Sequence, residues 1–115
     1  MAYSEFLADR VRQRLLLKGP VTEKKMMGGL IFMINDKMCM GIDIDKSSKN
    51  DRLMVRVGKL PYEELLEREG SRPMDFTGRV MRGFLFIDPE GFDKDADLDF
   101  WIRKALEFNK MISNK

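Results

Sequence analysis

The sequence has 115 residues, 43% apolar and 35% charged, a composition typical of a single globular domain spanning residues 1–115. Its 21 basic and 19 acidic residues leave a net charge of +2, so charge alone does not indicate a nucleic-acid-binding protein. The chain has no histidine and one cysteine, which excludes Ser–His–Asp and Cys–His catalysis, histidine zinc sites and an internal disulfide.

The first predicted element is a helix over residues 4–17. Ser4 suits the N-cap position, and Leu7, Val11 and Leu15 recur at the spacing of one buried helical stripe. Gly19-Pro20 ends the helix, because proline disfavours helical geometry at the residue before it.

A hairpin and a third strand follow. Residues 30–34 and 38–44 read as strands joined by Asn35-Asp36, residue types that tolerate the left-handed backbone of a tight turn. After a polar loop over 45–51, residues 53–57 alternate as a third strand.

The second half predicts two helices around one or two strands. Residues 62–69 read as a short helix between Pro61 and Gly70, 72–78 as an extended segment or short strand, 80–87 as a strand and 93–112 as the longest helix. The order α-β-β-β-α-β-β-α predicts a two-layer α+β fold, in which an antiparallel sheet of about five strands carries the helices.

The sequence predicts a cytoplasmic protein. Charged residues such as Glu5, Asp9 and Arg10 interrupt any signal-peptide core, and the apolar runs 28–34 and 83–87 are too short to cross a bilayer. A lone cysteine without an export signal agrees with a reducing compartment.

No catalytic, cofactor or metal site is predicted. Asp93, Asp95 and Asp97 have the first spacing of a calcium loop, but the later positions lack its glycine and glutamate, so we expect them to cap a helix. Gly28 and Gly29 lead into a strand rather than a helix, which favours a bulge or close backbone approach over a phosphate loop.

Apolar residues exceed what one sheet face can bury. Residues 30–34 and 84–87 are apolar on both faces, and Phe100 and Met111 lie nearly opposite the buried stripe of the last helix. We therefore expect a homodimer, with candidate interface residues Ile31, Met33, Phe100 and Met111.

Several segments together resemble the TfoX N-terminal domain family. They cover nearly the whole chain: residues 21–30 (VTEKKMMGGL), 37–41 (KMCMG), 53–58 (LMVRVG), 72–78 (RPMDFTG), 81–86 (MRGFLF) and 101–106 (WIRKAL). The resemblance implies an α+β fold with an antiparallel sheet similar to that of type III secretion chaperones, and no catalytic residues. Family members that regulate competence carry a further C-terminal domain. We expect this chain, in contrast, to be a single-domain member of the family.

The resemblance also marks positions as binding candidates, without giving their roles. They are Lys25, Met27, Gly28, Gly29, Arg56, Arg72, Asp75 and Arg79. We expect backbone roles for the two glycines, and ion pairs among Arg56, Asp75 and Arg79.

Two functions follow from these observations. The favoured one is a non-enzymatic regulatory or protein-interaction module that self-associates, related to transcription regulation through its family alone, with an unknown protein partner and no membrane or metal. The alternative is a nucleic-acid-binding accessory protein that uses a basic face, and its cations are Lys24, Lys25, Arg10 and Arg14, with Arg56, Arg79 and Arg82 as further candidates.

Overall fold

The computed structural model describes residues 3–26, 28–76 and 78–113. Its elements follow one another as α1 (Glu5–Leu16), β1 (Thr22–Met26), β2 (Gly29–Ile34), β3 (Lys37–Ile44), β4 (Asp51–Arg56), α2 (Tyr62–Leu65), β5 (Ser71–Phe76), β6 (Arg79–Ile87), a 3-10 turn (Pro89–Gly91) and α3 (Asp95–Ser113). The predicted α+β class with an antiparallel sheet is confirmed.

Local signals in the sequence account for the first helix and the first tight turn. The Ser4 hydroxyl accepts a hydrogen bond from the Leu7 amide at 3.3 Å and caps α1. Asn35 and Asp36 adopt φ values of 55° and 62°, which form the two-residue turn between β2 and β3.

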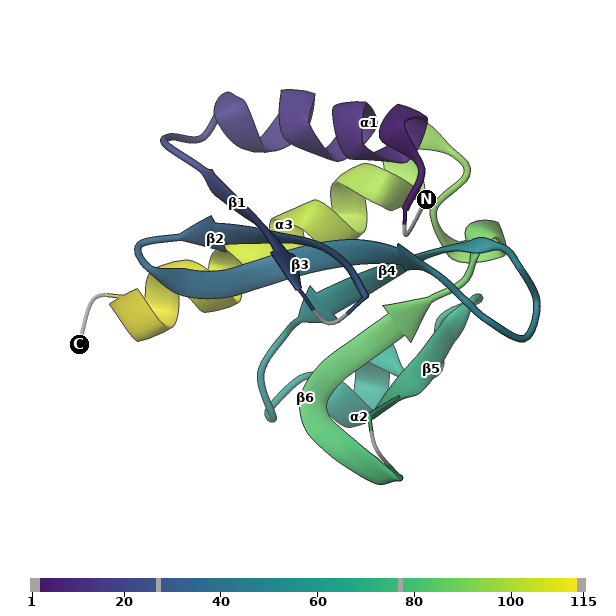
Figure 1. Cartoon of the computed structure of the whole chain (residues 1–115). Coiled ribbons are helices and arrows are strands. Elements are labelled where there is room, and N and C mark those ends of the chain that lie inside the picture. Colours follow the sequence, from purple (N-terminus) through teal and green to yellow (C-terminus); the bar gives the residue numbers. More distant parts are fainter. Residues whose placement is uncertain (1–2, 27, 77, 114–115) are drawn as a thin grey trace.

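The sheet has six strands in the order β1-β2-β3-β4-β6-β5, and every neighbouring pair is antiparallel. The chain crosses from β4 through α2 to the far edge as β5, then returns as β6 between them (Figure 1). β1 is the strand that the sequence analysis did not predict. Its sequence TEKKM lacks apolar alternation, and its five residues are exposed. Its pairing with β2, in which Lys24 lies opposite Ile31, defines it as a strand.

The helices cover one face of the sheet. α1 and α3 pack against each other, and α3 also contacts β3 and β4 (Figure 1). The core between them includes Leu7, Val11, Leu15, Phe32, Met40, Leu53, Val55, Leu85, Leu98 and Trp101.

The opposite face is covered within the same chain. Ile31, Met54, Met74 and Phe86 form a second buried cluster, although they come from four different strands. Strand β6 is strongly curved (Figure 1) and contains Gly83 at φ 95°, and the β5–β6 pairing is irregular between Pro73 and Asp75. The sheet therefore curls over its own second face, which corrects the expectation that the apolar surplus there needs a partner.

Two helix boundaries differ from the predicted ones. α2 is a single helical turn, and the chain continues as tight turns in which the Glu67 amide donates to the Glu64 carbonyl. α3 begins at Asp95, two residues later than predicted.

Candidate functional site

The family-derived binding candidates do not converge on one site. Lys25 lies exposed on edge strand β1, whereas Arg72, Asp75 and Arg79 lie at the opposite edge on β5 and β6. Arg56 ends β4 in the middle of the sheet. Met27 lies outside the described residues.

The two glycines have different local roles. Gly28 has φ +75° and open space around it. A Cβ atom on Gly29 would lie 2.1 Å from the Ile42 carbonyl oxygen, so the close approach of β2 and β3 requires a glycine at this position.

Arg72 is held by carboxylates. Its guanidinium donates to both oxygens of Asp88, at 2.6 and 2.8 Å, and to Asp45 at 3.2 Å. Arg52 bridges Asp45 to Asp43, so the four strands β3, β4, β6 and β5 are linked at this end of the sheet. These contacts give Arg72 a structural role.

Asp75 and Arg79 form no ion pair within the described part of the chain, in contrast to the expectation. The β5–β6 register pairs Asp75 with Val80 and Arg79 with Phe76. Because successive strand residues point to opposite faces, the carboxylate and the guanidinium leave the sheet on different sides.

The proposed basic face is already neutralised in part. Arg14 donates to Asp99 at 2.5 Å and to Asp95 at 3.0 Å, and Arg10 donates to Asp95 at 3.1 Å. Lys24 and Lys25 remain exposed on β1. Asp95 therefore binds two arginines across the α1–α3 contact. Among the residues that the structure describes, no three His, Cys, Asp or Glu side chains form a cluster suited to a metal ion.

Cys39 is a packing residue. It is 1% exposed in the core beneath the helices, and burial raises the pKa of its thiol to about 12, although nearby Arg56 acts in the opposite direction.

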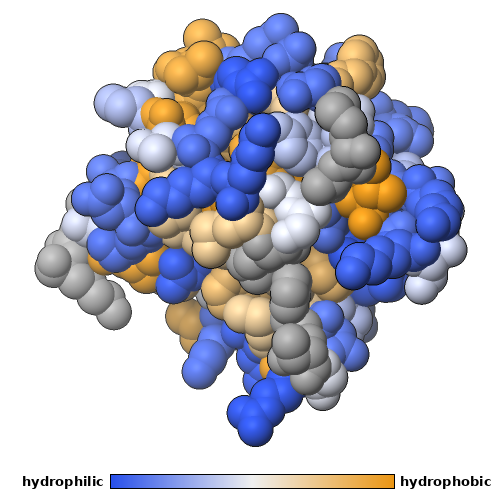
Figure 2. All heavy atoms as spheres, viewed as in Figure 1, coloured by the Kyte–Doolittle hydropathy of each residue, from blue (hydrophilic) through white to orange (hydrophobic). Residues whose placement is uncertain are grey.

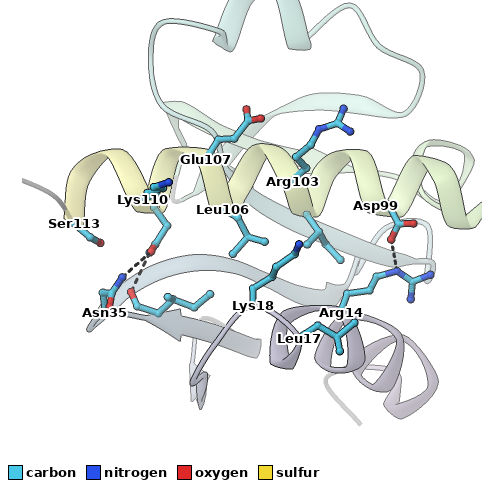
Figure 3. Close-up of a pocket in the computed structure, with 13 residues that line it drawn as sticks. Arg14, Leu17, Lys18, Asn35, Asp99, Arg103, Leu106, Glu107, Lys110 and Ser113 are labelled. Carbon is cyan, nitrogen blue, oxygen red and sulfur yellow. Dashed lines mark hydrogen bonds and ion pairs between the residues drawn. The ribbon is translucent and has the colours of Figure 1, made fainter.

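A concave feature lies between α1 and α3, and we call it the α1–α3 groove. It has a volume of about 760 Å³ and combines apolar residues with charges of both signs. Figure 3 shows Leu106 pointing from α3 into the groove beside Leu17 and Lys18, whereas Arg103 and Glu107 project from the outer side of α3. Its charged residues are Arg14, Lys18, Asp99, Arg103, Glu107 and Lys110.

A buried amide fixes the end of this groove. Asn109 is 3% exposed, and its side chain donates to the Ile34 carbonyl at 3.0 Å and accepts from Asn35 at 3.3 Å. The hairpin turn is thereby tied to α3, which sets one wall of the groove.

A second, smaller pocket lies at the other side of α3, and we call it the Arg56 pocket. Its volume is about 350 Å³, and it is formed by the end of β4, the loop after it, β6 at Gly83 and the C-terminal part of α3. Arg56 lines it with Phe84 and Phe108. No local sequence pattern indicates this pocket, because its walls come from segments far apart in the chain.

The expected dimer residues occupy unlike environments. Ile31 is fully buried and offers no surface to a partner, and Met33 is half-buried against the second cluster. Phe100 is half-buried under the Arg68 guanidinium, 3.7 Å from its ring centroid. Met111 alone is largely exposed, at 51%, and it lines the Arg56 pocket.

Other exposed apolar side chains lie on α1. Phe6 and Leu17 are 76% and 85% exposed, and Leu16 lies exposed beside Leu17. Hydrophobic atoms interrupt the hydrophilic surface near both ends of this helix (Figure 2).

The comparisons with known proteins identify the family. A sequence model of the TfoX N-terminal domain matches residues 13–109. The chain belongs to the TfoX N-terminal domain family. No curated protein and no solved structure matches this TfoX N-terminal domain. Within its described residues, no helix is both long enough and apolar enough to span a membrane.

Proposed function

We propose that this TfoX N-terminal domain is a non-enzymatic regulatory module that acts through protein–protein contact and forms a two-fold dimer along the α1–α3 groove. The observation that carries the proposal is the order of charges on α3. Asp99, Arg103, Glu107 and Lys110 alternate in sign, and all four border the groove, with the side chains of Arg103 and Glu107 at its outer rim.

The spacing places these charges on one side of the helix. At 100° per residue, the four positions fall within an arc of about 80°. All four are exposed, but Oδ1 of Asp99 already accepts a hydrogen bond from Arg14 at 2.5 Å, so its other carboxylate oxygen is the one that a partner would contact.

The charge order is complementary to itself when two copies of α3 run antiparallel. Asp99 of one copy then faces Lys110 of the other, and Arg103 faces Glu107. A two-fold axis repeats each contact, as an isologous interface requires. Arg103 has no carboxylate within ion-pair distance among the described residues, and Glu107 has only a 3.5 Å contact with Lys104.

Apolar residues supply the affinity in this arrangement, and the charges set the register. Leu106 lies in the groove between Arg103 and Lys110 in sequence, and Leu17 is an apolar residue of its wall that is 85% exposed. Burying both against a second copy removes their apolar surface from water.

The nucleic-acid alternative has weaker support. Arg10 and Arg14 direct guanidinium donors to Asp95 and Asp99, so they are less available to phosphates. Lys24 and Lys25 remain as exposed cations on a single edge strand.

Sedimentation equilibrium at micromolar concentration tests the dimer. We expect a mass that rises with concentration toward twice 13.4 kDa. Glu107→Lys replaces two attractive contacts with two repulsive ones and should weaken the dimer about tenfold. The double variant Arg103→Glu/Glu107→Lys restores opposite charges across the axis and should restore the dimer.

Matched controls separate a specific contact from net charge. Arg79→Glu and Glu67→Lys make the same charge changes at exposed positions away from the groove and should leave the dimer intact. A constant mass near 13.4 kDa overturns the proposal. A monomer that binds DNA with an affinity falling steeply with salt would support the alternative instead.

A further inference from the structure

The Arg56 pocket has a charge distribution unlike that of the α1–α3 groove. Three cations line it, Arg56, Lys59 and Arg82, and its described lining includes no carboxylate. Arg82 pairs at 2.6 Å with Glu63, which lies outside the lining, while Arg56 and Lys59 have no ion pair with any described residue.

Arg56 is held in place by aromatic rings rather than by acids. Its guanidinium carbon lies 5.4 Å from the ring centroids of both Phe84 and Phe108. Its only hydrogen bond to a described residue is a long one, 3.5 Å, to the Met38 carbonyl. A guanidinium has five N–H donors, so most of its hydrogen-bonding capacity is free in a partly buried position.

The backbone around Arg56 is fixed by two glycines with positive φ. A Cβ atom on Gly58 would lie 2.5 Å from the Phe108 ring, so the loop packs directly on α3. The Gly83 carbonyl accepts hydrogen bonds from the amides of Val57 and Gly58, at 2.8 and 3.1 Å. The pocket is therefore formed before any ligand arrives.

The rest of the lining is apolar. Leu60, Met111 and Ile112 complete the wall with the two phenylalanines. A volume of about 350 Å³ is at the small end of the range for organic ligands.

We propose that the Arg56 pocket binds a small carboxylic acid with an apolar chain or ring. The carboxylate accepts two parallel hydrogen bonds from the planar guanidinium of Arg56, a geometry that lysine cannot offer. The apolar part lies against Phe108 and Met111. Lys59 and Arg82 at the pocket add a positive field that favours the anion.

Titration with sodium octanoate, followed by amide NMR spectra of the intact chain, tests this site. We expect saturable shifts of the Gly58 and Gly83 amides. Octylammonium chloride, which has the same chain and the opposite charge, should give no saturable shift.

Variants assign the effect to Arg56. Arg56→Gln should weaken octanoate binding about tenfold because it removes a charge-assisted bidentate contact. Arg79→Gln is the same substitution at an exposed position outside the Arg56 pocket and should leave octanoate affinity unchanged.

A second pair of variants avoids the aromatic packing around Arg56. Met111→Glu places a carboxylate at the exposed wall and should weaken binding, whereas Lys46→Gln, with the same change in net charge at an exposed loop position, should not. Equal shifts with octanoate and octylammonium, or an unaltered affinity in both Arg56→Gln and Met111→Glu, overturn the proposal.

One further comparison identifies the source of the carboxylate. N-acetyl-leucyl-leucine carries a C-terminal carboxylate on an apolar peptide, and its amide lacks that charge. Binding of the acid but not of the amide supports the same site, and an affinity above that of octanoate would point to a protein C-terminus as the natural source. Weaker binding than octanoate would point to a free acid.

Discussion

The carboxylate of Asp43 accepts two hydrogen bonds from the guanidinium of Arg52, at 3.0 and 2.8 Å, and both side chains are nearly buried. The same guanidinium lies 3.6 Å from the centroid of the Phe86 ring. Asp43→Ala leaves a buried cation without its main partner, and we expect a loss of about 3 kcal/mol of unfolding free energy.

Urea unfolding measures this loss. Glu63→Ala is the control, because its ion pair with Arg82 is exposed and should contribute nothing measurable. Equal effects of the two substitutions would contradict the structural role given to Asp43.

Asp45 and Asp51 should change stability in opposite directions with pH. The Ser47 amide, with Arg52 and Arg72, lowers the pKa of Asp45, whereas burial, with nearby Asp93, raises the pKa of Asp51. Asp45 therefore stabilises the folded state at neutral pH, and this contribution is lost as the pH falls below about 4. Asp51 carries a penalty at neutral pH that is relieved as the pH falls through its raised pKa.

Thermal unfolding at pH 7 and at low pH tests both signs. At pH 7, Asp45→Asn should lower the Tm and Asp51→Asn should raise it, each by about 2 °C. At a pH where both wild-type carboxyls are protonated, the two differences should shrink. Tm differences of the same size at both pH values would show that the carboxylate charges do not cause them.

Gly29 should tolerate no side chain. Gly29→Ala forces a Cβ atom against the Ile42 carbonyl, and we expect a loss of about 3 kcal/mol in denaturant unfolding. Gly28→Asn is the control, because asparagine tolerates positive φ and the space there is open, so its cost should stay below about 0.5 kcal/mol. A loss below about 0.5 kcal/mol for Gly29→Ala as well would contradict this expectation and indicate that β2 and β3 separate easily at this point.

The Cys39 thiol should be unreactive in the folded protein. Its pKa of about 12 leaves almost no thiolate at pH 8, and its side chain is buried. We expect labelling by an aromatic disulfide reagent to follow the unfolding rate and to become immediate in denaturant. Rapid labelling without denaturant would mean that α3 opens readily from β3.

Local features of the fold could be predicted from the sequence because their causes are local. The Ser4 cap, the Asn35-Asp36 turn and the buried stripe of α1 each depend on a few neighbouring residues. The charge order on α3 could be derived in the same way, since it requires only helical spacing.

Features that depend on long-range pairing could not be predicted. β1 has no apolar alternation, and it is a strand because β2 offers it a free edge. The Arg56 pocket requires β6 to turn at Gly83 so that Phe84 and Phe108, which are far apart in sequence, both lie beside one arginine.

Strand β1 also bears on whether a further strand can add to the sheet. An exposed sheet edge is a template on which further chains can add strand by strand, and charged side chains are a common protection against such growth. Glu23, Lys24 and Lys25 occupy the middle of β1, and Glu23 is tied back to α1 through Arg12. A molecule approaching this edge would have to desolvate two ammonium groups. The charges at the middle of β1 therefore oppose the addition of a further strand at this edge.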